Sequence, residues 1–356
     1  MTPITLPELT QLIEDRLPIV QRSLRGLPLT RVTLRDAVFV QCDLSEADLA
    51  EARLDTVSFA ECALPGARFA GARLHRVSFG ACDLAGVVFD DSALESVSIA
   101  GGKLARARFD RATVTKCGFL KTDCTGISLR QARIERAALL DCPLAGADLT
   151  RARLHNVAIT KADLTGVTLA GVRIDTAMLM EAQMSGMVLE GMRLRRCNFK
   201  GSDLAGARLA GADLRQCLFV EADLTRADLS GSHAPGAMFI GAKLQGTRLA
   251  RANLELANFS EADLSAADFA AAGLRYAQMP GAICTGARFV GADMEFADLS
   301  MTELDGADFA GAELARAKLH LARENGANWT DSTRSRAYDT DLELAEAQTF
   351  QPKGGE

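Results

Sequence analysis

Nine cysteines and four histidines are the residues of this 356-residue chain that most directly suggest metal or redox chemistry. Cys42, Cys62 and Cys82 are spaced by twenty residues, whereas His75 and His155 are eighty residues apart. Neither a Cys-x-x-Cys nor a His-Glu-x-x-His spacing occurs. The evenly spaced cysteines could form disulfides or a thiolate metal ladder if the fold stacks them, but thiols also pack as small hydrophobic groups. The choice depends on the elements that position them.

Apolar residues recur at every fifth position from Leu24 to Leu319, and no charged residue occupies any of these central positions. A second column, two residues before each centre, holds mostly Ala, Cys, Val, Ser or Thr. A period of five fits neither a helix, which repeats every 3.6 residues, nor a strand, which alternates every 2. It predicts a backbone that turns a corner every five residues, with one large and one small side chain pointing inward.

Phenylalanines and cysteines indicate how many corners make one coil. Of the 16 phenylalanines, all but Phe296 and Phe350 lie at central positions whose numbers end in nine. This ten-residue spacing, together with the twenty-residue spacing of three cysteines, predicts a four-sided coil of twenty residues. All nine cysteines then point inward, which favours buried thiols. His75 and His155 fall on one side but four coils apart, so they cannot share a metal ion or a proton.

The tripeptide Ala-Asp-Leu or Ala-Asn-Leu recurs in this register, as at residues 47–49, 147–149, 222–224, 252–254 and 297–299. With this motif the chain resembles the pentapeptide-repeat family over residues 24 to 329. The resemblance implies an all-β fold, a right-handed quadrilateral β-helix of about fifteen coils. The handedness is implied by the family and not by the spacing.

Three segments are expected: an N-terminal helical cap over residues 1–23, the β-helix over residues 24–329, and a C-terminal cap with a flexible tail over residues 330–356. The caps would cover the core that a solenoid leaves open at each end. A helix is predicted over residues 7–17, and its apolar side would comprise Leu9, Leu12, Ile13 and Leu17. Trp329 is predicted to plug the far end, and a weak helix is expected near residues 341–348.

Composition limits the classes of function. Hydrophobic residues make up 48% of the chain, which allows an ordered core, and no run of eighteen apolar residues occurs. The N-terminus lacks the charged and then apolar pattern of a secretory signal. We therefore expect a cytoplasmic protein whose partner is neither a membrane nor a nucleic acid.

The register assigns each outward residue to one of four sides. One side carries an acidic column, which comprises Asp43, Asp83, Asp123, Asp163, Asp203, Asp223 and Asp263. The opposite side carries a basic column, which comprises Arg53, Arg73, Arg133, Arg153, Arg173 and Arg193. Aspartate in this slot fits the family motif and local bonds to the backbone. Arginine is less explained by the motif, and it indicates either an acidic partner or a solvated face.

A third side carries apolar residues at positions that should face solvent, beginning with Val38 and Val40. Between residues 120 and 240 this apolar stripe comprises Leu120, Leu140, Met178, Met180, Leu218, Val220, Met238 and Ile240. Because contiguous exposed apolar surface usually marks an interface, we expect the stripe to bind a protein or a second copy of the chain. An end cap is the other place where two copies could meet. The alternative is that these side chains lean over neighbouring coils and cover the core.

These features predict a non-catalytic scaffold, without catalytic residues, metal or cofactor. Catalysis needs polar groups that converge in a concave site, and a convex solenoid without a Gly-rich phosphate loop offers none. Phe-x-x-Cys at residues 39–42, 59–62 and 79–82 resembles family members that act as adaptors or load effectors in type VI secretion. A secretion component or effector is therefore the preferred partner. The alternative is a DNA mimic that binds DNA gyrase, as other family members do, but a basic column opposite the acidic one fits it poorly.

Overall fold

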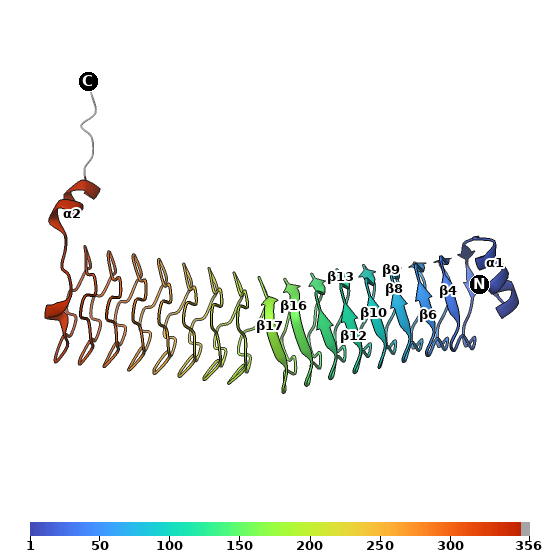
Figure 1. Ribbon diagram of the computed structural model, residues 1–356, viewed down its shortest axis with the longest axis horizontal. Coiled ribbons are helices and arrows are strands. Elements are labelled where there is room, and N and C mark those ends of the chain that lie inside the picture. The colour runs from blue at the N-terminus through green and yellow to red at the C-terminus, as the bar shows by residue number, and fades with distance from the viewer. Residues whose placement is uncertain (350–356) are drawn as a thin grey trace, which may run out of the picture. The chain divides into compact units, whose positions relative to one another are not determined.

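The computed structural model describes residues 1–349 and contains two compact units, Met1–Gln183 (unit 1) and Met184–Glu356 (unit 2) (Figure 1). In each unit the chain winds in successive coils, and residues twenty positions apart pair with one another. Leu34 pairs with Leu54 in unit 1, and Asp203 pairs with Asp223 in unit 2. This register confirms the predicted coil of twenty residues. The single domain predicted over residues 24–329 stays a prediction.

Two neighbouring sides of unit 1 are parallel β-strands (Figure 1). The side with the basic column consists of β4 (Thr33–Arg35), β6 (Arg53–Asp55), β8 (Arg73–His75), β10 (Ala93–Glu95), β12 (Thr113–Thr115) and β14 (Arg133–Glu135). The next side consists of β2 (Ile19–Val20), β5 (Val38–Val40), β7 (Ser58–Ala60), β9 (Ser78–Gly80), β11 (Ser98–Ala100), β13 (Gly118–Leu120) and β15 (Ala138–Leu140). Two longer strands, β16 (Arg153–Thr160) and β17 (Arg173–Met178), run around the corner and belong to both sides.

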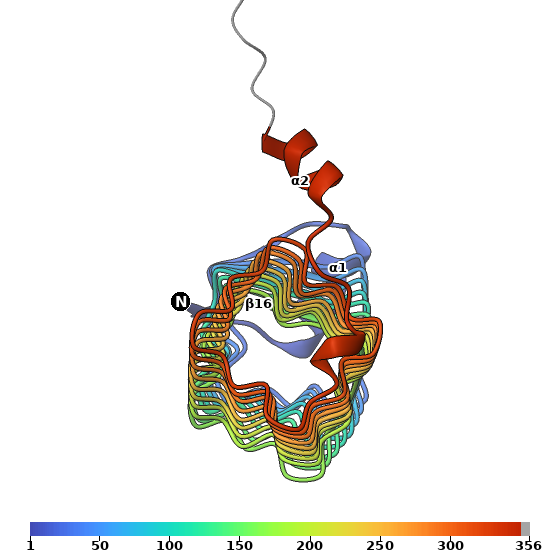
Figure 2. The same cartoon turned by 90° about the vertical axis from the view of Figure 1, so that its left-hand side faces the viewer.

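The other two sides of unit 1, and all sides of the coils in unit 2, are tight turns joined by isolated bridges. Figure 2 is viewed down the axis about which the chain winds, and the coils of unit 2 appear in it as four-cornered loops. At one such corner the N–H of Ala47 donates to the carbonyl of Leu44 (3.0 Å), and Glu46 between them has φ 59°. Every fifth residue from Gln21 to Asp331 has a positive φ. Side chains other than glycine cost roughly 1 kcal/mol or more there, which explains the many glycines at corners.

Stacked aromatic rings fill much of the core. Phe39 stacks on Phe59 in unit 1 with ring centroids 4.8 Å apart, and Phe219 stacks on Phe239 in unit 2 at 5.0 Å. All nine cysteines are buried and free, as expected of thiols that pack as hydrophobic groups. Burial raises the pKa of the Cys117 thiol to about 11, so this thiol is protonated and unreactive at neutral pH.

A short helix caps the N-terminal end of unit 1. This helix, α1 (Leu6–Glu14), begins after Thr5, whose hydroxyl accepts the N–H of Glu8 while the Glu8 carboxylate accepts the N–H of Thr5. Leu9 is buried, and Leu12 and Ile13 are half-buried. The prediction for Leu17 is wrong: it is exposed, because α1 ends before it. Alongside, β1 (Thr2–Pro3) pairs with β3 (Arg22–Ser23).

Trp329 extends the aromatic column at the C-terminal end of unit 2. Its ring stacks on Phe309 with centroids 4.2 Å apart, and the guanidinium of Arg334 lies 5.5 Å from its centroid. The 3-10 helix η1 (Arg334–Arg336) follows, and α2 (Leu342–Thr349) forms where a weak helix was predicted. No helix within residues 1–349 has the length and apolar character needed to cross a membrane. The predicted flexible tail extends past residue 349, outside the described residues.

The Phe219 stack offers a direct test of the core. Phe219 is fully buried between rings of neighbouring coils, so Phe219→Ala should leave a cavity and lower the free energy of unfolding by about 3–5 kcal/mol. Urea unfolding followed by circular dichroism measures this loss. The control Phe219→Leu keeps most of the volume and should lose only about 1 kcal/mol. Equal losses for the two variants would contradict the packing account.

Candidate interaction surfaces

Histidines and carboxylates form separate pairs in this structure. His75 Nδ1 lies 2.8 Å from Asp55 Oδ1, and His155 Nδ1 lies 3.3 Å from Asp175 Oδ2, so that each pair joins adjacent coils. The hydrogen bond with His75 holds the pKa of Asp55 below its usual value. Strands β10, β12 and β14 separate the two histidines, in agreement with the register. Within residues 1–349, no three His, Cys, Asp or Glu side chains gather as a metal site.

The acidic column caps turns. At each of its positions the aspartate Oδ1 accepts the backbone N–H of the residue two positions later, at distances from 2.8 to 3.1 Å; this holds for Asp43, Asp83, Asp123, Asp163, Asp203, Asp223 and Asp263. The hydroxyl and the N–H of Thr165 both bond the carboxyl of Asp163 and hold its pKa below the usual value. The local bonding expected of this column is therefore present throughout it.

The basic column is exposed on the strands of unit 1, except for Arg193, which lies in unit 2. Arg53 and Arg73 are neighbours on β6 and β8. Arg133, Arg153 and Arg173 are neighbours on β14, β16 and β17, and we call these three the arginine row. Among the ion pairs of residues 1–349, the one that involves the arginine row joins Arg133 to Glu135 at 3.8 Å. Because like charges on adjacent strands repel each other, the row attracts anionic groups.

The apolar stripe falls partly on each unit. In unit 1 Leu120, Leu140 and Met178 are 46%, 37% and 45% exposed, whereas Met180 is half-buried. Leu120 and Leu140 are direct neighbours on β13 and β15. In unit 2 all four members of the stripe are half-buried, namely Leu218, Val220, Met238 and Ile240. The members in unit 1 thus stand out as interface candidates, while those in unit 2 partly cover the core.

A larger feature of unit 1 escaped the sequence reasoning. The positions on either side of each centre along this side carry no charge from Val38 to Met180; they are Val38, Val40, Ser58, Ala60, Ser78, Gly80, Ser98, Ala100, Gly118, Leu120, Ala138, Leu140, Ala158, Thr160, Met178 and Met180. We call this surface the uncharged face. Its signal was available in the register, because charged residues occur at these two slots on each of the other three sides and are missing on this one.

The uncharged face lies between the two charged sides of unit 1. Each coil runs from the basic side (for example residues 33–35) to the uncharged face (38–40) and then to the acidic side (43–45). The corners that border the face are mostly polar, as at Asp36, Arg76, Gln41 and Glu61. A surface that lacks charge, exposes large apolar side chains such as Leu120 and Leu140, and has a polar rim is typical of a protein-binding site.

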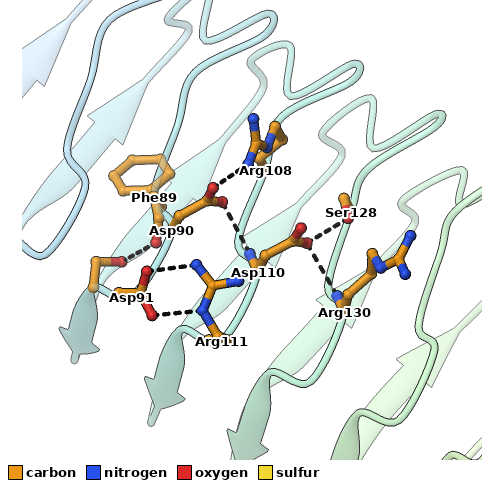
Figure 3. A network of polar contacts seen from close by, with 9 residues as sticks. Phe89, Asp90, Asp91, Arg108, Asp110, Arg111, Ser128 and Arg130 are labelled. Carbon is orange, nitrogen blue, oxygen red and sulfur yellow. Dashed lines mark hydrogen bonds and ion pairs between the residues drawn. The ribbon is translucent and has the colours of Figure 1, made fainter.

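A network of aspartates and arginines joins coils on the fourth side of unit 1 (Figure 3). Asp90 is 7% exposed, pairs with Arg108, and accepts the N–H of Asp110 at 3.2 Å. Asp110 in turn accepts the N–H of Arg130 at 3.2 Å. Asp91 and Arg111 form an exposed ion pair at 2.6 Å beside this network. Because these bonds run between successive coils, the network stabilises their stacking.

Comparison with known families agrees with this geometry. The profile described as "Pentapeptide repeats (8 copies)" matches residues 127–166 and, in overlapping copies, residues 177–323, which together exceed half of the chain. The profile of the "Pentapeptide repeat region" matches residues 21–89. This chain belongs to the pentapeptide repeat family. Its fold is accordingly the right-handed quadrilateral β-helix of that family.

Solved structures of pentapeptide repeat proteins are similar to this chain. HetL, which is involved in heterocyst differentiation regulation in the cyanobacterium Nostoc sp. strain PCC 7120, is 28% identical, with 64% of this chain and 90% of HetL covered and a TM-score of 0.32. QnrB1, a plasmid-mediated fluoroquinolone resistance protein, is 21% identical, with 55% and 94% covered and a TM-score of 0.32. A search among curated protein sequences found no match.

The capping role of the acidic column predicts how this pentapeptide repeat protein responds to acid. Because the pKa of Asp163 is lowered in the folded chain, the stabilisation by its carboxylate is complete above the unfolded pKa of about 3.9 and is lost as the pH falls below it. Asp163→Asn keeps an oxygen acceptor without a charge and should lose less stability than wild type between neutral and acid pH. Urea unfolding midpoints of the two proteins at a series of pH values measure the difference. Parallel pH profiles would contradict the prediction.

The network in Figure 3 predicts different effects at two adjacent aspartates. Asp90→Ala removes a buried acceptor from the N–H of Asp110 and should lower the free energy of unfolding by about 1–3 kcal/mol. The matched variant Asp91→Ala breaks an exposed ion pair and should change stability little. Thermal unfolding of both variants tests this, and a larger loss at Asp91 would rule out the assigned roles.

Proposed function

We propose that this pentapeptide repeat protein is a non-catalytic scaffold whose protein partner binds along the uncharged face of unit 1. The observation that carries the proposal is the absence of charge at sixteen outward positions of one side. Charged residues make up 24% of the chain, so about four would be expected there at the average frequency. Solubility alone favours charged residues on a strand surface, so their absence needs another reason.

The size of the face indicates that the partner reaches beyond it. Eight coils at about 4.8 Å per strand, with about 10 Å of each strand, give roughly 400 Å². A standard interface covers about 800 Å² on each partner. A stable complex therefore requires contact with a neighbouring side as well, and the arginine row lies on one of these sides. The partner that fits best has an apolar surface bordered by acidic residues.

The identity of the partner is a finer part of the proposal. A type VI secretion component or effector in the cytoplasm is preferred, on the resemblance of the Phe-x-x-Cys segments to adaptor members of the family. A DNA mimic acting on gyrase would need an acidic surface. The uncharged face and the arginine row support the scaffold over that alternative.

Two adjacent substitutions on the face test the proposal. Leu120→Asp with Leu140→Asp places two carboxylates on neighbouring strands of the uncharged face. The double variant should no longer capture the partner from lysate of the native cell, because burial of an unpaired charge in an interface is strongly unfavourable. Quantitative mass spectrometry of the captured proteins measures the loss, and sedimentation of the purified protein reports whether a second copy is the partner instead.

Lys103→Asp with Thr125→Asp is the matched control, since both side chains are exposed on the acidic side in neighbouring coils. The control should retain the partner, and both variants should keep the unfolding midpoint of the wild type. Capture of the same set of proteins by all three would refute binding along the uncharged face. Inhibition of gyrase supercoiling by the purified protein would instead favour the DNA-mimic alternative.

A further inference from the structure

One corner of unit 2 carries bulky apolar side chains. Leu256, Tyr276 and Phe296 occupy this corner in three successive coils, with φ values of 59°, 58° and 61°. All corners from Gln21 to Asp331 have such a left-handed conformation, and the residues other than glycine found there are mostly polar, so the apolar side chains set this corner apart. Gly236 occupies the same corner one coil earlier, so the fold accepts glycine here. The sequence contained a signal, because Phe296 lies outside the register of the core phenylalanines.

These three side chains do not serve the core. Leu256 is 60% exposed, Tyr276 is 40% exposed and Phe296 is half-buried, whereas the core positions beside them, such as Leu254 and Leu274, are fully buried. The rings of Tyr276 and Phe296 stack with centroids 4.7 Å apart. Apolar residues that remain at the surface, although the packing of the core does not require them, are typical of binding sites.

Two arginines extend this corner. The guanidinium of Arg275 lies 5.9 Å from the Tyr276 centroid and 5.8 Å from the Phe296 centroid. The guanidinium of Arg316 lies 5.4 Å from the Phe296 centroid. Arg275 also pairs with Glu295 and Asp293, whereas no ion pair of Arg316 is found within the described residues. The Phe296 ring thus holds the guanidinium of Arg316 in place for an anion.

A groove opens at the other end of the same corner. Because Gly236 has no side chain, a hollow of about 450 Å³ remains there, and its lining comprises Arg195, Arg196, Arg215, Gln216, Pro235, Gly236 and Leu256. Among the lining residues, Arg195 and Arg215 are the two whose ion pairs are known. Asp213 lies nearby and bonds both Arg195 and Arg215, so one carboxylate serves two guanidinium groups. The groove is therefore positively charged at one end and apolar at the end formed by Leu256.

We propose that this groove and the adjoining corner bind an acidic peptide segment that carries large apolar side chains. Carboxylates of the segment would bond the guanidinium groups of Arg195 and Arg215, and an apolar side chain would pack on Pro235 and Leu256. The segment would continue over Tyr276 toward Arg316. The site lies entirely in unit 2, so it does not depend on the partner proposed for the uncharged face.

Glycine substitution separates a binding role from a structural one. The triple variant Leu256→Gly, Tyr276→Gly and Phe296→Gly places at each corner the residue that adopts a positive φ most readily. The unfolding midpoint should therefore stay the same or rise. The affinity for a fluorescein-labelled peptide of alternating glutamate and phenylalanine should fall at least tenfold, because the apolar contacts are lost. Fluorescence anisotropy of the full-length protein measures the affinity, and urea unfolding measures the midpoint.

Met301→Gly is the matched control, since Met301 is an exposed apolar residue with φ 57° at a different corner. It should leave the affinity unchanged. Two further peptides test the chemistry: alternating lysine and phenylalanine should not bind, and alternating glutamate and serine should bind at least tenfold more weakly. The proposal is overturned if the wild type does not bind the glutamate–phenylalanine peptide, if the triple variant binds it equally well, or if the triple variant is clearly less stable.

Discussion

Backbone hydrogen bonds between neighbouring coils hold the other features of this protein in place. The N–H of Leu44 donates to the carbonyl of Ala63 at 2.7 Å, and the N–H of Ala63 donates to the carbonyl of Cys42 at 2.9 Å. The same alternation recurs along both units, with an offset of twenty residues. Each side chain therefore lies next to the one twenty positions earlier. Phenylalanine stacks on phenylalanine inside the coils, and each surface residue becomes a member of a column.

Because residues of one kind are stacked in columns, each favourable or unfavourable interaction between neighbours is repeated from coil to coil. Aspartate in the acidic column repeats a bond to a turn N–H, and pairs such as Arg111 with Asp91 join neighbouring coils. The arginine row repeats a repulsion instead, and the corner from Leu256 to Phe296 repeats bulky apolar side chains on the surface. The fold requires neither the row of like charges nor these side chains. These residues lower the stability of the solenoid or add nothing to it. A binding role is a physical reason for their presence.

The period of five predicted the coil because it is set by the backbone, and the central positions report it directly. The period did not predict which sides are strands, since leucine centres occur on strands and turns alike. A second, partial signal lies in the small column after the corner between the two strand sides. In unit 1 half of these positions are valine (Val57, Val77, Val97 and Val157) and the others are alanine or cysteine, whereas in unit 2 all are cysteine or alanine. β-branched residues favour extended backbone. Exposure was harder to predict, because neighbouring coils decide how far side chains such as Leu218 lean over the core.

Spacing also limits what can bind along the arginine row. Neighbouring members of a column are about 4.8 Å apart, the distance between paired strands. Successive turns of an α-helix are about 5.4 Å apart. Carboxylates placed one turn apart would therefore be displaced from the three arginines by only about 1 Å at the third one. Side chains on one face of an extended strand are about 6.8 Å apart, so by the third arginine they would be displaced from it by about 4 Å. If the proposed partner extends over Arg133, Arg153 and Arg173, their spacing therefore matches an acidic helix of about three turns better than an extended strand, because flexible arginine side chains can absorb the smaller mismatch and not the larger one.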